Sequence, residues 1–180
     1  MKPISQMTQG ELAAYIDTHL KKKGIHVVLS GGACVAIYSG YKYVSKDLDF
    51  IALYTLNHKA IAEVMKEIDF LPDGRYYVHP DTQYFVEFIS GPPSVGEDPI
   101  REIQELEMGT GTLRIISPTE SVKDRLAAYY HWQDLQSLAQ AILVAKNQRI
   151  DLKNIEDWSN REGKHKEFLV FKRQMGKLID

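Results

Sequence analysis

Hydrophobic and polar positions in the first forty residues alternate between helix-like and strand-like spacing. Residues 8–11 have the spacing of a capping box, and apolar positions four residues apart continue through residues 12–20, which predicts a helix. A short β-branched run at residues 25–29 predicts a strand that stops at the Ser-Gly-Gly of residues 30–32. Residues 33–39 have a helix-compatible composition, so the predicted order is helix, strand, glycine turn and short helix.

The next fifty residues contain three further strand candidates and one helix. Residues 47–53 alternate between polar and apolar, which is typical of a strand. Residues 58–68 carry apolar side chains at helical spacing. Residues 75–78 and 83–89 are strand candidates, and the loop at residues 79–82 predicts that they form a hairpin.

The second half of the chain changes from strand to helix patterns. Residues 90–99 hold three prolines and two glycines and predict a long connection or flap, and residues 112–116 predict one more short strand. Ser117-Pro-Thr-Glu120 is a helix start, and the spacing stays helical from there on. We therefore expect an α+β fold with a mixed strand and helix part, residues 1–116, followed by a helical region, residues 117–180.

Composition and charge exclude several classes of protein. The 180 residues are 44% hydrophobic and 26% charged, which is typical of a globular domain rather than a disordered chain. The longest apolar run, residues 33–38, is far shorter than the roughly 20 residues of a membrane span, and we expect a cytoplasmic protein. The single cysteine, Cys34, excludes an internal disulfide framework. A net charge of −2 gives no reason to expect a strong sequence-independent grip on nucleic acid.

Three acidic residues on predicted strands form the first candidate site. Asp47 and Asp49 alternate with apolar residues, so both side chains leave the same face of their strand. Two adjacent carboxylates repel each other unless a cation lies between them, and Mg²⁺ or Mn²⁺ is the natural candidate. Glu87 lies in an otherwise apolar strand and would also need solvent, a cation or a metal. A solvated edge strand is the alternative explanation for all three.

The glycine turn is the second candidate feature. Glycines between a strand and a helix let backbone N–H groups approach a ligand, and a helix N-terminus favours phosphate. A tight turn that needs positive φ is the alternative for Ser30-Gly31-Gly32. Together, a phosphate-binding turn and three acids for metal indicate a nucleotide site.

These segments, in this order, resemble the signature of the nucleotidyltransferase superfamily, whose fold is that of DNA polymerase β. They are Leu29-Ser-Gly-Gly-Ala33, Ser45-Lys-Asp-Leu-Asp-Phe50 and Val86-Glu-Phe88. Within the superfamily, the sequence is most similar to the abortive-infection toxin type of nucleotidyltransferase. Residues 122–129, which carry basic positions on a predicted helix, and residues 132–135 also resemble that group.

The resemblance covers residues 25 to about 140 and implies a mixed sheet flanked by helices, followed by C-terminal helices. It implies a Mg²⁺-dependent transfer of a nucleoside monophosphate from a nucleoside triphosphate to a hydroxyl of an RNA, a protein or a small molecule. It also implies an antitoxin partner if the protein is a toxin. By position, it implies catalytic and metal-binding roles for Asp47, Asp49 and Glu87, and nucleotide contacts for Ser30, Gly31, Gly32, Lys46, Lys123 and Arg125.

Two departures from the toxin-type pattern leave a second hypothesis open. Tyr43 stands where that group usually has an arginine, and Gln133 where it commonly has a lysine. Under this second hypothesis, the chain is a catalytically weak or inactive protein that binds nucleotides or partners. A solvated helix surface is equally compatible with Lys123 and Arg125, and an unrelated α+β fold with a simple metal site is a third hypothesis. The mildly basic segment 146–177 is where we would expect contact with RNA or a partner.

Overall fold

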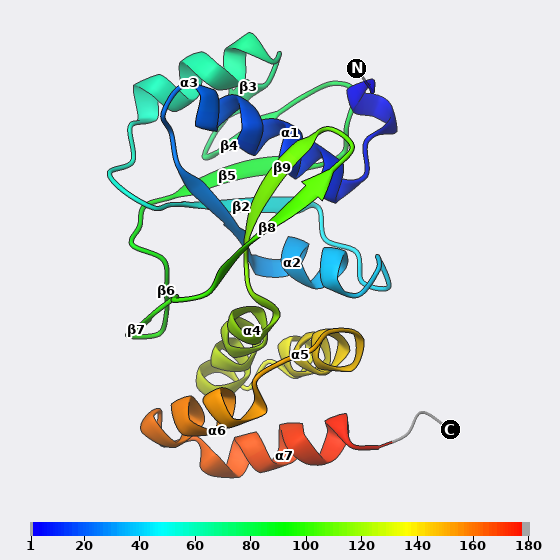
Figure 1. The fold of residues 1–180 in the computed structure, drawn as a ribbon, viewed down its shortest axis with the longest axis vertical. Coiled ribbons are helices and arrows are strands. Elements are labelled where there is room, and N and C mark those ends of the chain that lie inside the picture. The colour runs from blue at the N-terminus through cyan, green and yellow to red at the C-terminus, as the bar shows by residue number, and fades with distance from the viewer. Residues whose placement is uncertain (1, 178–180) are drawn as a thin grey trace.

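A mixed sheet of seven strands forms the centre of the N-terminal part in the computed structural model, which describes residues 2–177 (Figure 1). Along the sheet the strands follow the order β3-β4-β5-β2-β1-β9-β8. Their bounds are Val27–Ser30 (β1), Asp47–Ala52 (β2), Leu71–Asp73 (β3), Tyr76–Val78 (β4), Phe85–Ile89 (β5), Ile103–Met108 (β8) and Gly111–Ile116 (β9). A separate two-stranded sheet joins Ser94–Val95 (β6) and Asp98–Pro99 (β7).

Within the described residues, seven α-helices surround and extend this sheet. In Figure 1, α1 and α3 lie on the upper side of the sheet, α2 lies beneath it, and α4 to α7 stack together below α2. A short 3₁₀ turn at Ile4–Gln6 precedes the first helix. The helices are Gln9–Lys22 (α1), Gly31–Tyr38 (α2), His58–Glu67 (α3), Pro118–Trp132 (α4), Leu135–Asn147 (α5), Leu152–Arg161 (α6) and His165–Met175 (α7).

The sheet is mixed because β2 pairs antiparallel with β1 on one side and parallel with β5 on the other. Strand β1 also pairs parallel with β9, and β8 completes the edge as an antiparallel partner of β9. Strand β4 pairs antiparallel with β5, as the predicted hairpin requires. The α+β class expected from the sequence is therefore confirmed.

Side-chain caps explain where most of the helices begin. Thr8 and Glu11 form the predicted capping box of α1, and Ser117 accepts a hydrogen bond from the Glu120 amide at the start of α4. The side chains of Asn57, Asp134 and Asp151 cap α3, α5 and α6 in the same way. Helix α2 differs, because the side chain of its N-cap residue, Ser30, makes no capping hydrogen bond.

A buried ion pair fixes α1 to the sheet. The Arg114 guanidinium of β9 donates to both carboxylate oxygens of Asp17, at 2.6 and 3.3 Å, and also contacts His26 Nδ1 at 2.8 Å. Because arginine always donates, the ring nitrogen of His26 accepts this hydrogen bond. The ion pair therefore fixes the position of α1 relative to β9, the strand next to β1.

One apolar core runs from the sheet into the C-terminal helices. It joins Phe50 and Leu29 of the sheet to Leu126 of α4 and to Trp158 and Phe168 of the last two helices. Trp158 is fully buried and stacks on Tyr130, with 5.4 Å between ring centroids. Across residues 2–177, none of the helices is long and apolar enough to cross a membrane.

The predicted elements are confirmed, and the structure adds several that the sequence did not predict. Strand β3 occupies a segment with a turn-like Pro-Asp-Gly pattern, and β8 is a largely exposed edge strand. The predicted connection at residues 90–99 contains the small β6–β7 hairpin. Strands β3 and β8 lie at the edges of the sheet and β6 and β7 are only two residues long, so none of them carries the hydrophobic pattern that marks a buried strand.

Candidate functional site

Four polar side chains form a row across adjacent strands of the central sheet. The register pairs Ser30 of β1 with Asp49 of β2, Asp49 with Glu87 of β5, and Glu87 with Tyr76 of β4. Paired residues of neighbouring strands face the same side of a sheet. The polar row, defined as Ser30, Asp49, Glu87 and Tyr76, therefore lies on one face at the end of β1 where the glycine turn begins.

The alternation of β2 places the two aspartates on this face. Leu48 and Phe50 point the other way and have no exposed surface, whereas Asp47 is exposed and Asp49 is partly buried. Burying Leu48 and Phe50 fixes the register of the strand, because a one-residue slip would bring the aspartates into the core. The predicted shared face of Asp47 and Asp49 is thus present.

The environment of Asp49 favours its neutral form. Burial, together with the negative charges of Asp47 and Glu87, raises the pKa of Asp49 from 3.8 to about 6. The positive charge of Arg125 acts in the opposite direction and lowers the pKa. The charges of Asp47 and Glu87 therefore act on the Asp49 carboxyl, and a cation placed beside it would favour its ionised state.

Gly31 allows the glycine turn to pass directly over Asp49. Its φ of +71° lies in the left-handed region, and a Cβ at this position would collide with the Oδ2 atom of Asp49. Ser30 Oγ donates to the main-chain oxygen of Asp49 at 3.2 Å, which ties the end of β1 to β2. The turn and the carboxylate are consequently in direct contact.

The loop before β2 lies over the second glycine. A Cβ on Gly32 would be 3.0 Å from Ser45 Oγ and 3.5 Å from the ring of Tyr43. The buried Gln9 side chain holds this loop, since its Nε2 donates to the main-chain oxygens of Ser45 and Asp47 at 3.1 and 3.2 Å. The structure therefore places Tyr43, one of the two departures from the toxin-type pattern, beside the glycine turn.

The first turn of α2 has no side chain on its backbone amides. Ser30 Oγ is engaged by Asp49, so the N-terminal amides of this eight-residue helix lack the cap that most of the other helices have. Such amides are partial positive charges that bind phosphate well. This part of the site is suited to an anionic ligand.

The two residues of α4 that were expected to contact phosphate, Lys123 and Arg125, have different surroundings. Arg125 hydrogen-bonds Asp124 and Gln140, and its charge acts on Asp49. Lys123 is buried against Glu120, with 2.9 Å between Nζ and Oε2, and lines a separate cavity of about 390 Å³. The structure brings Arg125 towards the carboxylates and does not bring Lys123 there. Lys46 is exposed immediately before β2.

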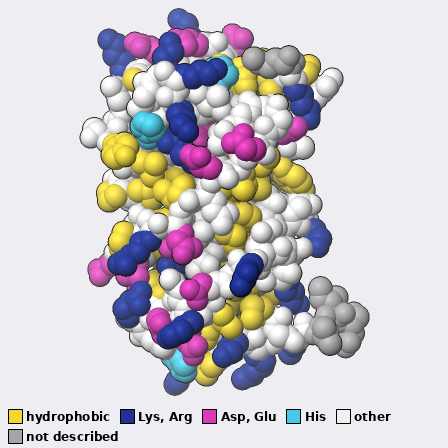
Figure 2. Space-filling view, in the orientation of Figure 1, with side chains coloured by type: hydrophobic (Ala, Val, Ile, Leu, Met, Phe, Trp, Pro, Cys, Tyr) yellow, Lys and Arg dark blue, Asp and Glu magenta, His cyan; other side chains and the backbone are white. Residues whose placement is uncertain are grey.

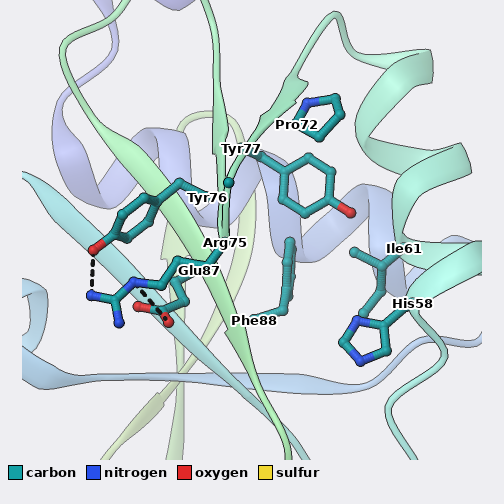
Figure 3. Close-up of a pocket in the computed structure, with 9 residues that line it drawn as sticks. His58, Ile61, Pro72, Arg75, Tyr76, Tyr77, Glu87 and Phe88 are labelled. Carbon is teal, nitrogen blue, oxygen red and sulfur yellow. Dashed lines mark hydrogen bonds and ion pairs between the residues drawn. The ribbon is translucent and has the colours of Figure 1, made fainter.

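The edge of the site beyond Glu87 is shown in Figure 3, together with a cavity of about 260 Å³. Arg75 Nε lies 3.5 Å from Glu87 Oε1, and Arg75 Nη2 donates to the Tyr76 hydroxyl at 2.5 Å. In the figure Arg75, Tyr76 and Glu87 lie on one side of β5, whereas Tyr77 and Phe88 lie on the other. Most of the cavity wall belongs to that second side.

The carboxylates suit Mg²⁺ or Mn²⁺ in chemistry, although they do not form a closed cage. Within residues 2–177, no three Asp, Glu, His or Cys side chains are arranged so that they could hold an ion. Mg²⁺ in phosphate-transfer sites is typically held by one or two carboxylates plus substrate phosphates. Asp47 and Asp49 fit that pattern, because they share a face and their charges repel without a cation.

Sequence reasoning missed Arg75, Tyr76 and Gln9 as parts of the site. Arg75 follows a Pro-Asp-Gly turn and Gln9 sits in the first turn of a helix, so neither carries a local signal for function. Only the pairing of β4 with β5, and the packing of α1 against the loop before β2, bring them to the carboxylates.

Two solved structures share this arrangement of strands and helices. An antigenic nucleotidyltransferase-like protein from Paracoccidioides brasiliensis superposes with a TM-score of 0.61 at 16% identity, over 79% of this chain and 78% of that chain. ANT(2")-Ia in complex with adenylyl-2"-tobramycin superposes with a TM-score of 0.54 at 11% identity, over 93% of this chain and 99% of that chain. The chain has a nucleotidyltransferase-like fold. No family model and no curated protein matches the sequence significantly.

Charge over the rest of this nucleotidyltransferase-like fold is mixed. In Figure 2, Lys and Arg side chains are interspersed with Asp and Glu side chains on the face shown. This face therefore carries no large patch of one charge sign, and any attraction for an anionic ligand has to come from local groups such as Arg125 and the amides of α2.

Proposed function

We propose that this protein is a Mg²⁺-dependent nucleotidyltransferase that moves a nucleoside monophosphate from a nucleoside triphosphate to a hydroxyl group. The observation that carries the proposal is the polar row, which aligns the glycine turn, Asp49 and Glu87 on one face. This order matches the roles that nucleotidyl transfer requires, namely a phosphate site, a metal site and a base. The nucleotidyltransferase-like neighbours support it at the level of the fold.

Each residue of the site has its own role in the proposed reaction. The amides of Gly31 and Gly32 and the Arg125 guanidinium bind the triphosphate, and Asp47 and Asp49 hold the metal ion. When bound, Mg²⁺ offsets the negative charge that develops on the phosphates. Glu87 accepts the proton of the acceptor hydroxyl. The hydroxyl oxygen forms a bond to the α-phosphorus, the bond from that phosphorus to the bridging oxygen breaks, and pyrophosphate leaves.

Calorimetric titration with Mg²⁺ and each nucleoside triphosphate tests the site. We expect the Asp47→Asn/Asp49→Asn variant to lose at least tenfold in affinity for the Mg²⁺–triphosphate complex, because both metal ligands become neutral. Glu63→Gln/Glu97→Gln removes the same charge at two exposed positions and is the matched control. Equal affinity in wild type and the Asp47/Asp49 variant would contradict the proposal.

We also propose that the activity is of the toxin type, which the likeness of residues 45–50 to that group supports. Induced expression in a bacterial host then arrests growth, and the Asp47→Asn/Asp49→Asn variant does not. A host that grows normally with the active protein contradicts the toxin role alone. An antitoxin partner is part of this proposal and would relieve the arrest on co-expression.

A non-catalytic nucleotide- or partner-binding module is the second candidate function. It is favoured by Tyr43, whose ring lies beside Gly32 where the toxin-type group usually has a cation. Incubation with α-labelled triphosphates and cell extract distinguishes the two functions. Label transfer that depends on Asp47 excludes the second candidate, and triphosphate binding without any transfer supports it.

A further inference from the structure

The end of the polar row beyond Glu87 carries an exposed arginine and two aromatic rings. The guanidinium of Arg75 lies over the ring of Tyr76, 4.8 Å from its centroid, and the ring of Phe85 is 5.8 Å from that of Tyr76. Tyr76 aligns with Glu87 and Phe85 aligns with Asp47, so both rings border the carboxylate face. The Arg75 side chain is 70% exposed, whereas that of Glu87 is 22% exposed.

The order of residues along the row gives it a direction. Neighbouring strands are about 4.8 Å apart, so Ser30 and Tyr76 mark ends separated by roughly 14 Å. Under the proposed function, the triphosphate occupies the Ser30 end of the row, and Glu87 takes the proton of the attacking hydroxyl. The acceptor must then approach from the side of β4 and β5, where Arg75 and Tyr76 lie.

The chemistry of that side selects among acceptors. An exposed guanidinium attracts a phosphate or carboxylate and repels an amine, and the rings of Tyr76 and Phe85 offer flat surfaces for stacking. Across residues 2–177, Arg75 is the only cation that forms an ion pair with a carboxylate of the polar row. The Tyr76 hydroxyl and ring restrain the guanidinium, which lowers the entropy lost when it binds a ligand.

We propose that Arg75 and Tyr76 form the acceptor-binding surface, and that the acceptor carries a negative group and a planar ring beside its reacting hydroxyl. This inference rests on the proposed function, because it uses Glu87 as the base. A nucleotide, either free or at the end of an RNA strand, has this chemistry. A polyamine such as an aminoglycoside does not.

Binding to the second site is measured with the first site saturated by Mg²⁺ and a non-hydrolysable triphosphate. The probes are AMP, a short labelled oligoribonucleotide and tobramycin. We expect wild type to bind AMP or the oligoribonucleotide, and Arg75→Ala to bind it at least about tenfold more weakly, since the variant loses a hydrogen bond to a charged group. Arg75→Lys should retain part of the affinity, and the affinity for the triphosphate itself should stay within about twofold in both variants.

Two further variants separate a specific contact from a general loss of charge or of fold. Arg173→Ala removes an arginine from the exposed surface of α7 and should bind every probe as wild type does. Tyr76→Phe keeps the ring and should bind more tightly than Tyr76→Leu. AMP binding without oligoribonucleotide binding identifies a free nucleotide as acceptor, and the reverse identifies an RNA end.

The inference is overturned if Arg75→Ala binds the probes like wild type, if tobramycin binds best, or if wild type with bound triphosphate binds neither nucleotide probe. These outcomes leave the proposed function intact, because triphosphate binding still depends on Asp47 and Asp49. Failure of wild type to bind any Mg²⁺–triphosphate complex overturns both.

Discussion

Gly31 has little freedom to change, for two separate reasons. Its positive φ excludes most side chains, and the carboxylate of Asp49 fills the space that a Cβ would occupy. The same close approach lets the backbone of the turn and the carboxylate of β2 face one ligand. Gly24 has a similar φ of +75°, but no atom lies within 4 Å of the place that its Cβ would take. A substitution at Gly24 therefore causes backbone strain alone, whereas one at Gly31 adds a steric collision.

We expect Gly31→Ala to lose at least tenfold in affinity for the Mg²⁺–triphosphate complex, because the new Cβ displaces the Asp49 carboxylate. Gly24→Ala should cost about 1 kcal/mol in the free energy of unfolding through backbone strain alone and leave affinity unchanged. Chemical denaturation and calorimetry measure the two effects. Comparable loss of affinity in both variants would show that the collision with Asp49 is unimportant.

At the scale of elements, the sequence predicts what is local and misses what depends on pairing. The helices that begin at Thr8 and Ser117 carry caps in the sequence itself, and β2 shows its two faces by alternation. Strands β3 and β8 lie at the two ends of the sheet and have no fully buried residue. Such edge strands are stabilised by hydrogen bonds to a neighbour that no local pattern specifies.

The candidate site follows the same rule. That Asp47 and Asp49 share a face was predictable from a period of two. That Asp49 aligns with Glu87 was not, because the parallel pairing of β2 and β5 joins distant segments. The two basic residues of α4 were predicted to act together, but positions two apart on a helix do not face each other, and the structure separates Arg125 from Lys123 accordingly.

The two faces of α4 predict different outcomes for its two basic residues. Arg125→Met should weaken triphosphate binding at least tenfold with a small effect on stability. Lys123→Met should leave binding of the folded protein unchanged and cost about 3–5 kcal/mol in the free energy of unfolding, because Glu120 stays buried without its partner.

Thermal unfolding and calorimetry on both variants check this division of roles. The double variant Glu120→Gln/Lys123→Met removes both charges of the buried pair and should recover much of the stability lost in Lys123→Met. A tenfold loss of triphosphate affinity in Lys123→Met would instead place that lysine at the phosphates.

At the scale of the whole molecule, the carboxylates of the site oppose folding unless they bind a cation. Asp49 has a pKa near 6 in the folded protein, above its ordinary value of 3.8, so the folded state holds this proton more tightly than the unfolded state does. The contribution of Asp49 to stability therefore falls as pH rises between about 4 and 6, and this loss is complete above that range. A shift of about two pH units corresponds to at most about 3 kcal/mol.

We expect Asp49→Asn to be more stable than wild type above pH 6 without divalent ions, and the difference to vanish below pH 4, where Asp49 is neutral in both states. Thermal unfolding of both proteins from pH 3.5 to 8 measures it, with the exposed Glu63→Gln as a control whose curve runs parallel to that of wild type. Adding Mg²⁺ at pH 7 should stabilise wild type more than Asp49→Asn, because binding to the folded state favours the ionised carboxylate. A constant difference between Asp49→Asn and wild type across the whole pH range would show that Asp49 is not the group whose proton the fold retains.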